Sequence, residues 1–451
     1  MVPLKKKADP SEGSDQGSVL VQDANIWTGT GLSKGSILID QGKIQKIARR
    51  IETRGGETIN ASGLLALPGL VDVHVHLRDM DLAHKEDFAS GTAAAAAGGF
   101  TSLLDMPNTQ PPTDSPRRLA EKQEKAAAEV YVNVGFHVAA VPNSQPVQGM
   151  ASLGAFSLKL YMPKPISRLN VKDDVELLEM MKASRDAGLP VTVHAEDPEI
   201  TENASKSTSF LEMAKARSPE SESKAVERII ELQKKSRCQV HFCHLTLSSS
   251  LNRIGSAAKG MTTEVTPHHV LLSQNHLSRL GWRAWMVPPL RLEKNRRELL
   301  KDVATNAVTV VASDHAPHTI EEKDQPPRES PPGVPGLETT LRLLLTLVNK
   351  RVLNLSHLVK LLASNPAQVF GLRTKGKLRP GADGDVVLVD MKKKTRIDST
   401  MFFSKAKFSP FDGFLTKGAV HSTIVNGMLV YHDGEIVARR GSGQVLRRKT
   451  R

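Results

Sequence analysis

Val-Asp-Val-His-Val-His-Leu-Arg, at residues 71–78, alternates apolar with polar side chains. Such alternation predicts a β-strand, because successive side chains of a strand point to opposite faces. Asp72, His74 and His76 then share one face, and two imidazoles two residues apart can bind the same metal ion. Two ordinary core histidines are the alternative. Their position beside Asp72 favours a metal site at the end of a strand.

The same pattern of an apolar strand, a polar strand end and a helical stretch recurs along the chain as far as Pro317. The strands that we expect are 70–77, 101–106, 130–138, 156–162, 191–194, 238–243, 262–266 and 308–312. The helical stretches between them include 85–97, 116–128, 172–187, 222–235 and 293–306. Eight strands alternating with helices favour an α/β fold, a closed (β/α)8 TIM-like barrel. An open doubly wound sheet is the alternative.

Both ends of the chain show short strands and turns without the intervening helices. These strands are expected at 19–22, 35–40, 44–47, 384–390 and 422–432. We therefore expect a small β-sandwich-like domain built from both ends, residues 18–64 and 375–440, beside a metal-dependent barrel at 65–374. Residues 1–17 are expected to be a disordered tail and residues 441–451 a basic C-terminal tail.

The composition indicates a globular protein with a large core, since 39% of the 451 residues are hydrophobic. No apolar run reaches the roughly 18 residues that a membrane span needs. The first 18 residues lack the apolar centre of a secretory signal. Two cysteines, Cys238 and Cys243, cannot form a disulfide framework, which favours the reducing cytoplasm.

A net charge of +13 raises the question of nucleic acid binding. Much of the excess lies in short runs such as 5–7, 392–394 and 447–451, and only 4% of residues are aromatic, too few for stacking platforms. We therefore favour solubility, or attraction of an anionic small-molecule substrate, over a nucleic acid partner.

Three further metal-type residues stand at the ends of later strands. His194 and His244 fall where barrel strands deliver ligands, at their C-terminal ends, although each could be an ordinary polar residue. Asp314 follows the eighth strand. A carboxylate there can bind metal and also carry a proton, whereas a cap or turn residue is the alternative.

Lys159 alternates with apolar neighbours in the strand 156–162, which places its ammonium in the crowded barrel interior. An unpaired buried charge is costly, so two solutions are open. The lysine could pair with a carboxylate. It could instead react as the neutral amine with carbon dioxide, and the resulting anionic carbamate has two oxygens that can bridge two metal ions.

These motifs form an ordered series along most of the chain. After 72–78 come Asp-Met-Pro-Asn-Thr (105–109), Leu-Lys-Leu-Tyr (158–161), Val-His-Ala-Glu (193–196), Cys-His-Leu (243–245), Pro-His-His (267–269), Ser-Asp-His-Ala-Pro-His (313–318) and Pro-Gly-Val-Pro-Gly-Leu-Glu-Thr (332–339). In this order and spacing the chain resembles the amidohydrolase superfamily and, within it, the type I dihydroorotases, over roughly residues 18–435.

The resemblance implies two zinc ions per chain. Their implied ligands are His74, His76 and Asp314 for one ion, His194 and His244 for the other, and carboxylated Lys159 as the bridge. Asp314 would also be catalytic, taking a proton from the attacking water and returning it to the leaving nitrogen. The implied substrate-binding residues are His76, Arg78, Asn108, His318, Pro332 and Gly333.

Arg78 is the implied partner of the substrate carboxylate, because a guanidinium binds carboxylates through a planar fork. A rim ion pair with Asp79 or Glu86 is the alternative. Cys243 and Glu264 match positions that hold an additional zinc ion in the animal multifunctional relative, and a structural role is favoured for them here.

The implied reaction is the reversible interconversion of N-carbamoyl-L-aspartate and (S)-dihydroorotate in de novo pyrimidine (UMP) biosynthesis. Val287 stands where many relatives have a polar residue, which keeps an allantoinase or hydantoinase open. Another alternative is a catalytically silent scaffold for aspartate transcarbamoylase, although the complete ligand set argues against it. A homodimer and an association with aspartate transcarbamoylase also stay open.

Overall fold

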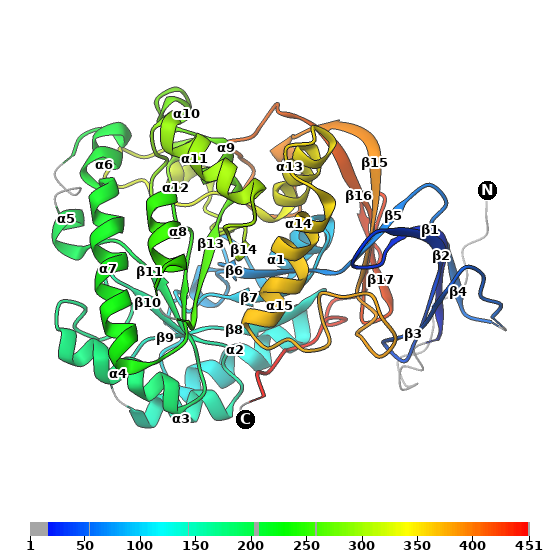
Figure 1. The fold of residues 1–451 in the computed structure, drawn as a ribbon, viewed down its shortest axis with the longest axis horizontal. Coiled ribbons are helices and arrows are strands. Elements are labelled where there is room, and N and C mark those ends of the chain that lie inside the picture. Colours follow the sequence, from blue (N-terminus) through cyan, green and yellow to red (C-terminus); the bar gives the residue numbers. More distant parts are fainter. Residues whose placement is uncertain (1–16, 54, 143, 203–206, 258, 450–451) are drawn as a thin grey trace.

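The computed structural model describes residues 17–449, apart from residues 54, 143, 203–206 and 258. The expected disordered tail therefore lies, except for Gly17, outside the described residues. A barrel of parallel strands surrounded by helices lies beside a mixed β-sheet (Figure 1). The predicted α/β class, with a β unit built from both chain ends, is confirmed.

All eight predicted barrel strands are present. They are β6 (Leu70–Val75), β7 (Phe100–Asp105), β8 (Asn133–Phe136), β10 (Leu158–Tyr161), β11 (Val191–His194), β12 (Val240–Phe242), β13 (Met261–Val265) and β14 (Val310–Val311). A two-residue strand, β9 (Val138–Ala139), continues from β8 and pairs with β10. The hydrogen-bonded order runs β6-β7-β8 and then β9-β10-β11-β12-β13-β14. A parallel bridge between Val75 and His315 joins the two arcs, so the sheet is closed.

The five predicted helical stretches are also present, as α1, α2, α4, α7 and α11. The α-helices are α1 (Phe88–Ala97), α2 (Pro116–Glu129), α3 (Ser144–Ser152), α4 (Asp174–Asp186), α5 (Pro198–Glu202), α6 (Phe210–Ala216), α7 (Pro219–Ser236), α8 (Ser248–Gly255), α9 (Pro267–Leu271), α10 (Gln274–Leu280), α11 (Glu293–Ala304), α12 (Ile320–Lys323), α13 (Leu337–Asn349), α14 (Leu355–Val359) and α15 (Asn365–Val369). A π-helical turn, η4 (Lys360–Ser364), joins α14 to α15. None of the described helices combines the length and apolarity needed to cross a membrane.

Nine strands form the sheet beside the barrel. They are β1 (Val19–Trp27), β2 (Leu32–Asp40), β3 (Lys43–Ala48), β4 (Glu57–Asn60), β5 (Leu65–Pro68), β15 (Val386–Arg396), β16 (Leu415–Val425), β17 (Met428–His432) and β18 (Glu435–Ile436). Strand β5 pairs with both β1 and β15, so the two chain ends meet in one sheet with its own apolar core. Since β5 runs directly into β6, this sheet leads straight into the barrel.

The chain after β18 returns to the barrel. Val134 of β8 donates to the carbonyl of Gln444 and accepts from the N–H of Leu446. Further on, Arg448 Nη1 donates to the carbonyl of Phe370 at 2.8 Å. The basic C-terminal segment, as far as it is described, therefore packs along the barrel.

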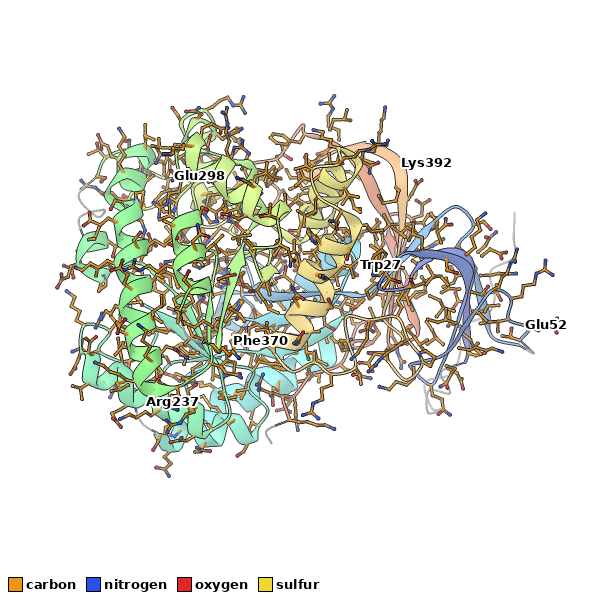
Figure 2. All side chains as sticks on the ribbon, in the orientation of Figure 1. Trp27, Glu52, Arg237, Glu298, Phe370 and Lys392 are labelled. Atoms are coloured by element: carbon orange, nitrogen blue, oxygen red, sulfur yellow. The ribbon has the colours of Figure 1, made fainter. Side chains whose placement is uncertain are left out.

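Phe370, labelled in Figure 2, directly follows α15 and is fully buried. Its ring lies 5.4 Å from that of His137 and 5.2 Å from that of His241, two residues on different sides of the barrel. It packs in a buried apolar cluster with residues of β6, β7 and β14. This packing leaves polar side chains to meet at the other end, where the strands finish.

Candidate metal centre

Four histidines meet at the C-terminal ends of the barrel strands. His74 lies on β6, His76 follows that strand, His194 ends β11, and His244 comes just after β12. The ring centroids of His74 and His76 lie 5.5 Å apart, those of His74 and His244 5.0 Å, and those of His194 and His244 4.5 Å. The structure thus brings together the four histidines that the sequence singled out.

Asp314 completes one side of this cluster. Its Oδ1 lies 3.3 Å from His74 Nε2 and 3.2 Å from His76 Nε2, and one ligand atom from each residue lies within 4.8 Å of the others. On the other side, His194 Nδ1 lies 3.0 Å from His244 Nε2. Asp314 (φ 44°) and His244 (φ 33°) both have left-handed backbones, which are uncommon outside glycine and gather at functional sites.

Burial keeps these histidines neutral, which is the form that binds a metal ion. It lowers the pKa of His194 to about 4, and it lowers the pKa values of His76 and His244 well below the ordinary value. Nearby Lys159 adds to the effect on all three. The donor set of neutral imidazoles and a carboxylate is therefore one that suits zinc.

Buried carboxylates fix the orientation of two of the rings. Glu264 Oε1 lies 2.8 Å from His74 Nδ1 and accepts the backbone N–H of His244 at 2.9 Å. Glu196 Oε2 lies 2.6 Å from His194 Nε2, and Arg217 also binds Glu196. Although burial raises the pKa of Glu196, Arg217 and His194 hold it at about 2. Such outer carboxylates set the tautomer and direction of metal-binding histidines.

Sequence reasoning missed the role of Glu196 and considered Glu264 only as part of an additional zinc position or as structural. Two local signals were available. Glu196 comes two residues after His194, and Glu264 is an acidic residue within the buried end of β13. One ligand atom each from His74, Cys243 and Glu264 also lies within 4.8 Å of the others. Because burial raises the pKa of the Cys243 thiol, it stays protonated, which suits a structural role.

Lys159 lies in the middle of the cluster with 3% of its surface exposed. Its Nζ donates to Cys243 Sγ at 3.2 Å. Within the described part of the chain, no carboxylate lies within 4.0 Å of this ammonium. The carboxylate pairing that the sequence left open is therefore not present among these residues.

Arg78 lies close to His76 and Asp314 and contacts the segment that follows β14. Its Nε donates to the carbonyl of Pro317 at 3.2 Å, and its Nη2 lies 3.1 Å from His318 Nε2. Asp79 pairs instead with Lys125, and no ion pair joins Arg78 to Asp79 or Glu86 among the described residues. The rim ion pair considered above is therefore wrong. Burial lowers the pKa of Arg78 to about 10, so the guanidinium stays charged at neutral pH.

His318 stands among cations. Burial lowers the pKa of His318, and the neighbouring charges of Arg78, Lys85 and Lys323 lower it further, which keeps the imidazole neutral. Lys85 is balanced by Glu322 at 3.0 Å. Beside His76, Asn108 has a buried Oδ1 with no hydrogen-bond partner in the described structure. The surroundings of the metal-type cluster thus offer positive charge and an unsatisfied amide oxygen.

Pro332 and Gly333 lie next to His318. The carbonyl of Pro332 faces His318 Nε2 at 3.1 Å. The N–H of Gly333 donates to the carbonyl of Trp285 at 3.0 Å, so only its carbonyl remains for a ligand. Gly333 has φ 138°, and a Cβ there would lie 2.5 Å from the carbonyl oxygen of Ala316, so no other residue fits.

The sequence of this chain is similar to those of known proteins. The model of the amidohydrolase family matches residues 65–430. The chain is 38% identical over 411 residues to a dihydroorotase of Methanothermobacter thermautotrophicus, covering 90% of this chain and 93% of the relative. It is 35% identical over 422 residues to a dihydroorotase of Pyrococcus furiosus, covering 92% and 93%.

Among solved structures, an L-hydantoinase (dihydropyrimidinase) from Arthrobacter aurescens is similar, with a TM-score of 0.92 and 29% identity. The match covers 96% of this chain and 100% of that one. A dihydropyrimidinase from Brevibacillus agri has a TM-score of 0.89 and 26% identity, covering 96% and 99%.

Proposed function

Because the chain belongs to the amidohydrolase family, we propose that it is a dihydroorotase, interconverting N-carbamoyl-L-aspartate and (S)-dihydroorotate in de novo pyrimidine biosynthesis. One observation carries the proposal. A cluster of metal-type side chains lies directly beside the buried Arg78–His318 contact. A ring amide that also bears a carboxylate could contact the cluster through the amide and Arg78 through the carboxylate.

We propose that the cluster holds two zinc ions. His74, His76 and Asp314 would bind one, His194 and His244 the other, and carboxylated Lys159 would join them. Bound zinc lowers the pKa of water from near 16 to about 7 and polarises a carbonyl. Neutral imidazoles fixed by Glu264 and Glu196 support this assignment.

Carboxylation of Lys159 is supported by the surroundings of its side chain. Among the described residues, an ammonium buried among four histidines has only a thiol as its hydrogen-bond partner. A carbamate replaces this positive charge with a negative one and supplies two oxygen ligands. The change removes the cost of an uncompensated buried cation and provides the bridge.

The remaining residues have roles in binding and proton transfer. Arg78 and His318 would bind the substrate carboxylate, and Asn108 Oδ1 would accept a hydrogen bond from a ring N–H. Asp314, aimed at the cluster from the end of β14, would accept the proton of the attacking water and return it to the leaving nitrogen. In ring closure the same proton moves in the opposite direction.

A hydantoinase is the second candidate, since the similar solved structures include hydantoinases. Unsubstituted hydantoin has no carboxylate, so Arg78 would have no partner in its complex. Purified metal-loaded protein should be assayed on dihydroorotate, carbamoyl aspartate, hydantoin and allantoin. The highest kcat/KM on dihydroorotate supports the proposal, whereas a higher kcat/KM on hydantoin or allantoin overturns it. Protein stripped of metal is the control.

A homodimer, an association with aspartate transcarbamoylase and a cytoplasmic location remain proposals. Sedimentation of the protein alone and mixed with aspartate transcarbamoylase tests the first two. A fluorescent fusion of the full chain tests the third.

A further inference from the structure

A second cavity lies at the end of the barrel opposite the metal centre. Its lining includes Pro190, Gln239, Gly260 and Thr309, which directly precede β11, β12, β13 and β14. The active sites of such barrels lie at the other end of the strands. The cavity has a volume of about 1540 Å³, larger than the roughly 300–1,000 Å³ of typical small-molecule sites.

Positive charge dominates this cavity. Within the described part of the chain, nine arginines and lysines line it, against a single carboxylate residue, Asp383. They come from segments far apart in the sequence, from Arg185 in the last turn of α4 to Lys449 near the C-terminus. Side chains of like charge in one concavity repel each other, and low-dielectric walls strengthen the field inside it.

Most of these cations lack a protein counter-ion. Within the described residues, six of the nine have neither an ion pair nor a side-chain hydrogen bond: Arg237, Arg373, Lys377, Arg379, Arg447 and Lys449. Burial and the neighbouring Arg379 lower the pKa of Lys377, and burial lowers that of Arg448. Lys375, by contrast, is paired with Asp383 and Asp385. Among the described residues, the cavity therefore concentrates six cations without an ion pair, and the nearest carboxylate, Asp383, is already shared with Lys43 and Lys375.

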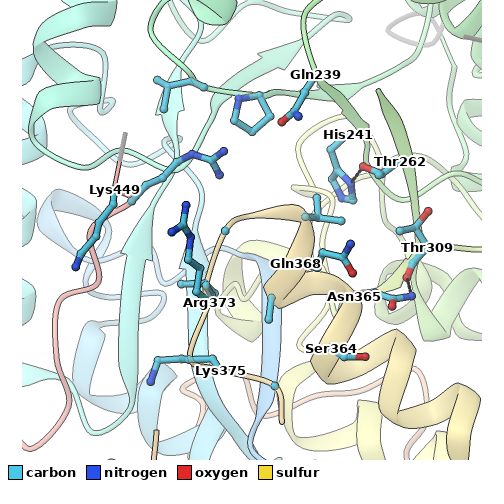
Figure 3. A pocket seen from close by; sticks show the side chains of 18 of the residues that line it. Gln239, His241, Thr262, Thr309, Ser364, Asn365, Gln368, Arg373, Lys375 and Lys449 are labelled. Atoms are coloured by element: carbon cyan, nitrogen blue, oxygen red, sulfur yellow. Dashed lines mark hydrogen bonds between the residues drawn. The ribbon is translucent and has the colours of Figure 1, made fainter. Parts of the chain in front are cut away.

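The opposite wall is polar and uncharged (Figure 3). Arg373 and Lys449 lie on one side of the view, and Thr262, Thr309 and Asn365 lie on the other. Asn365 donates to the carbonyl of Thr309 at 2.8 Å, which fixes its orientation. The π-helical turn η4 leads into this wall, and such turns are frequent at functional sites.

We propose that this cavity is a binding site for a small ligand that carries two or more phosphates, such as pyrophosphate or the phosphate chain of a nucleotide. The arginines and lysines of the loop 373–379 and of the segment 447–449 bind the phosphates through charge-assisted hydrogen bonds. The amides and hydroxyls of the opposite wall contact the remainder of the ligand. The site is separate from the metal centre and does not depend on the proposed reaction.

Calorimetric titration of the metal-loaded, full-length protein with pyrophosphate and with ATP tests the proposal. Each should saturate one site. The double variant Arg373→Glu/Arg447→Glu should bind both pyrophosphate and ATP at least about tenfold more weakly, because each exchange replaces attraction of the phosphates by repulsion. Both positions are exposed, so the fold should be retained. ATP binding more tightly than pyrophosphate identifies a nucleotide ligand, and equal affinities identify the phosphate chain alone.

The matched control is Lys34→Glu/Lys46→Glu, which changes the net charge equally at exposed positions on β2 and β3. Metal content is measured after each titration, because the added phosphates can chelate metal ions. The heat of such chelation would be the same in both double variants. The proposal is overturned by an equal loss of phosphate affinity in both double variants, by the absence of saturable binding, or by binding of duplex DNA without binding of pyrophosphate. Thermal unfolding confirms folding, so the result can be interpreted whether or not dihydroorotate is turned over.

Discussion

Glu264 Oε1 lies 2.8 Å from His74 Nδ1, so the other ring nitrogen of His74 is left facing Asp314. The contact joins β13 to β6. Although burial alone raises the pKa of Glu264, His74 and His241 hold it well below the usual range, and the carboxylate stays ionised. Glu264 therefore sets which nitrogen of His74 is offered to a metal ion.

Glu264→Gln should weaken metal binding by about 10- to 100-fold, because the amide no longer fixes the ring as a carboxylate does. Competition with a chromophoric chelator measures the affinity. Glu338→Gln is the matched control, since Glu338 is a buried carboxylate that accepts N–H groups of Phe403 and Ser404 rather than a histidine. Unchanged affinity in Glu264→Gln would show that the contact does not position the ligand.

Lys159→Ala should lose metal and activity together, because the bridging group is removed, and short carboxylic acids such as propionate should restore part of both. Metal analysis and turnover with and without the acid are the measurements. Lys122→Ala provides the control, since Lys122 is equally buried but is paired with Asp105 at 2.6 Å. Rescue of both variants by the acid, or two retained metals in Lys159→Ala, would argue against the bridge.

Arg78→Met should reduce binding of the substrate carboxylate while metal stays bound. A charge-assisted contact contributes roughly 1.5–3 kcal/mol, so kcat/KM on dihydroorotate should fall by about one to two orders of magnitude. Arg117→Met, which removes an exposed arginine of α2, should leave kcat/KM unchanged. If Arg78→Met kept normal kinetics, the carboxylate would bind elsewhere.

Lys323 is a buried lysine whose Nζ donates to the carbonyls of Trp285 and Pro331, both at 2.9 Å. Burial lowers its pKa from 10.5 to about 7. Between these values the unfolded chain binds a proton that the folded protein does not. The contribution of Lys323 to the free energy of unfolding therefore rises with pH over this interval, by up to about 1.4 kcal/mol per pH unit.

Lys323→Met keeps the apolar stem and removes the titrating group, so this rise should disappear. Urea unfolding of both proteins at pH 6.5, 8 and 9.5 measures it. The difference in the free energy of unfolding between them should change steadily from pH 7 upward. Parallel pH curves would mean that Lys323 has an ordinary pKa in the folded protein.

The barrel could be predicted from the sequence because each strand is a short apolar run that ends in a polar residue. His74 and His194 were found by this local pattern. The contact of Glu264 with His74 was not, since it joins residues 190 positions apart and nothing local specifies which acid faces which ring. The two-residue strand β9 was not predicted as a separate strand, because it is defined by its pairing with β10 rather than by its composition.

The basic cavity illustrates the same limit. Of its cations, only those of the run 447–451 stand out in the sequence, and such runs were attributed to solubility or to the attraction of an anionic substrate. Arg185, Arg373 and Arg447 converge only once the chain after β18 has returned to the base of the barrel. Long-range packing, rather than local composition, creates that concentration of charge.

Asp314 is proposed to carry the proton as well as to bind metal. Burial raises its pKa, whereas His74 and Lys159 act in the opposite direction. Hydrolysis of dihydroorotate needs the carboxylate form as base, so its rate should fall as pH decreases. Ring closure needs the protonated form, so its rate should fall as pH increases. Initial rates measured in both directions from pH 5 to pH 10 should therefore give opposed profiles.

Asp314→Asn separates the two roles, because the amide keeps the shape and one oxygen ligand but cannot carry a proton. It should retain much of the metal, while the rates of hydrolysis and of ring closure both fall by several orders of magnitude. Asp314→Ala should also lose metal, since the Oδ1 of Asp314 lies near His74 and His76. Metal content measured on each variant beside the two pH profiles makes the distinction. If Asp314→Asn kept near-normal rates with parallel profiles, another group would move the proton and Asp314 would be a ligand alone.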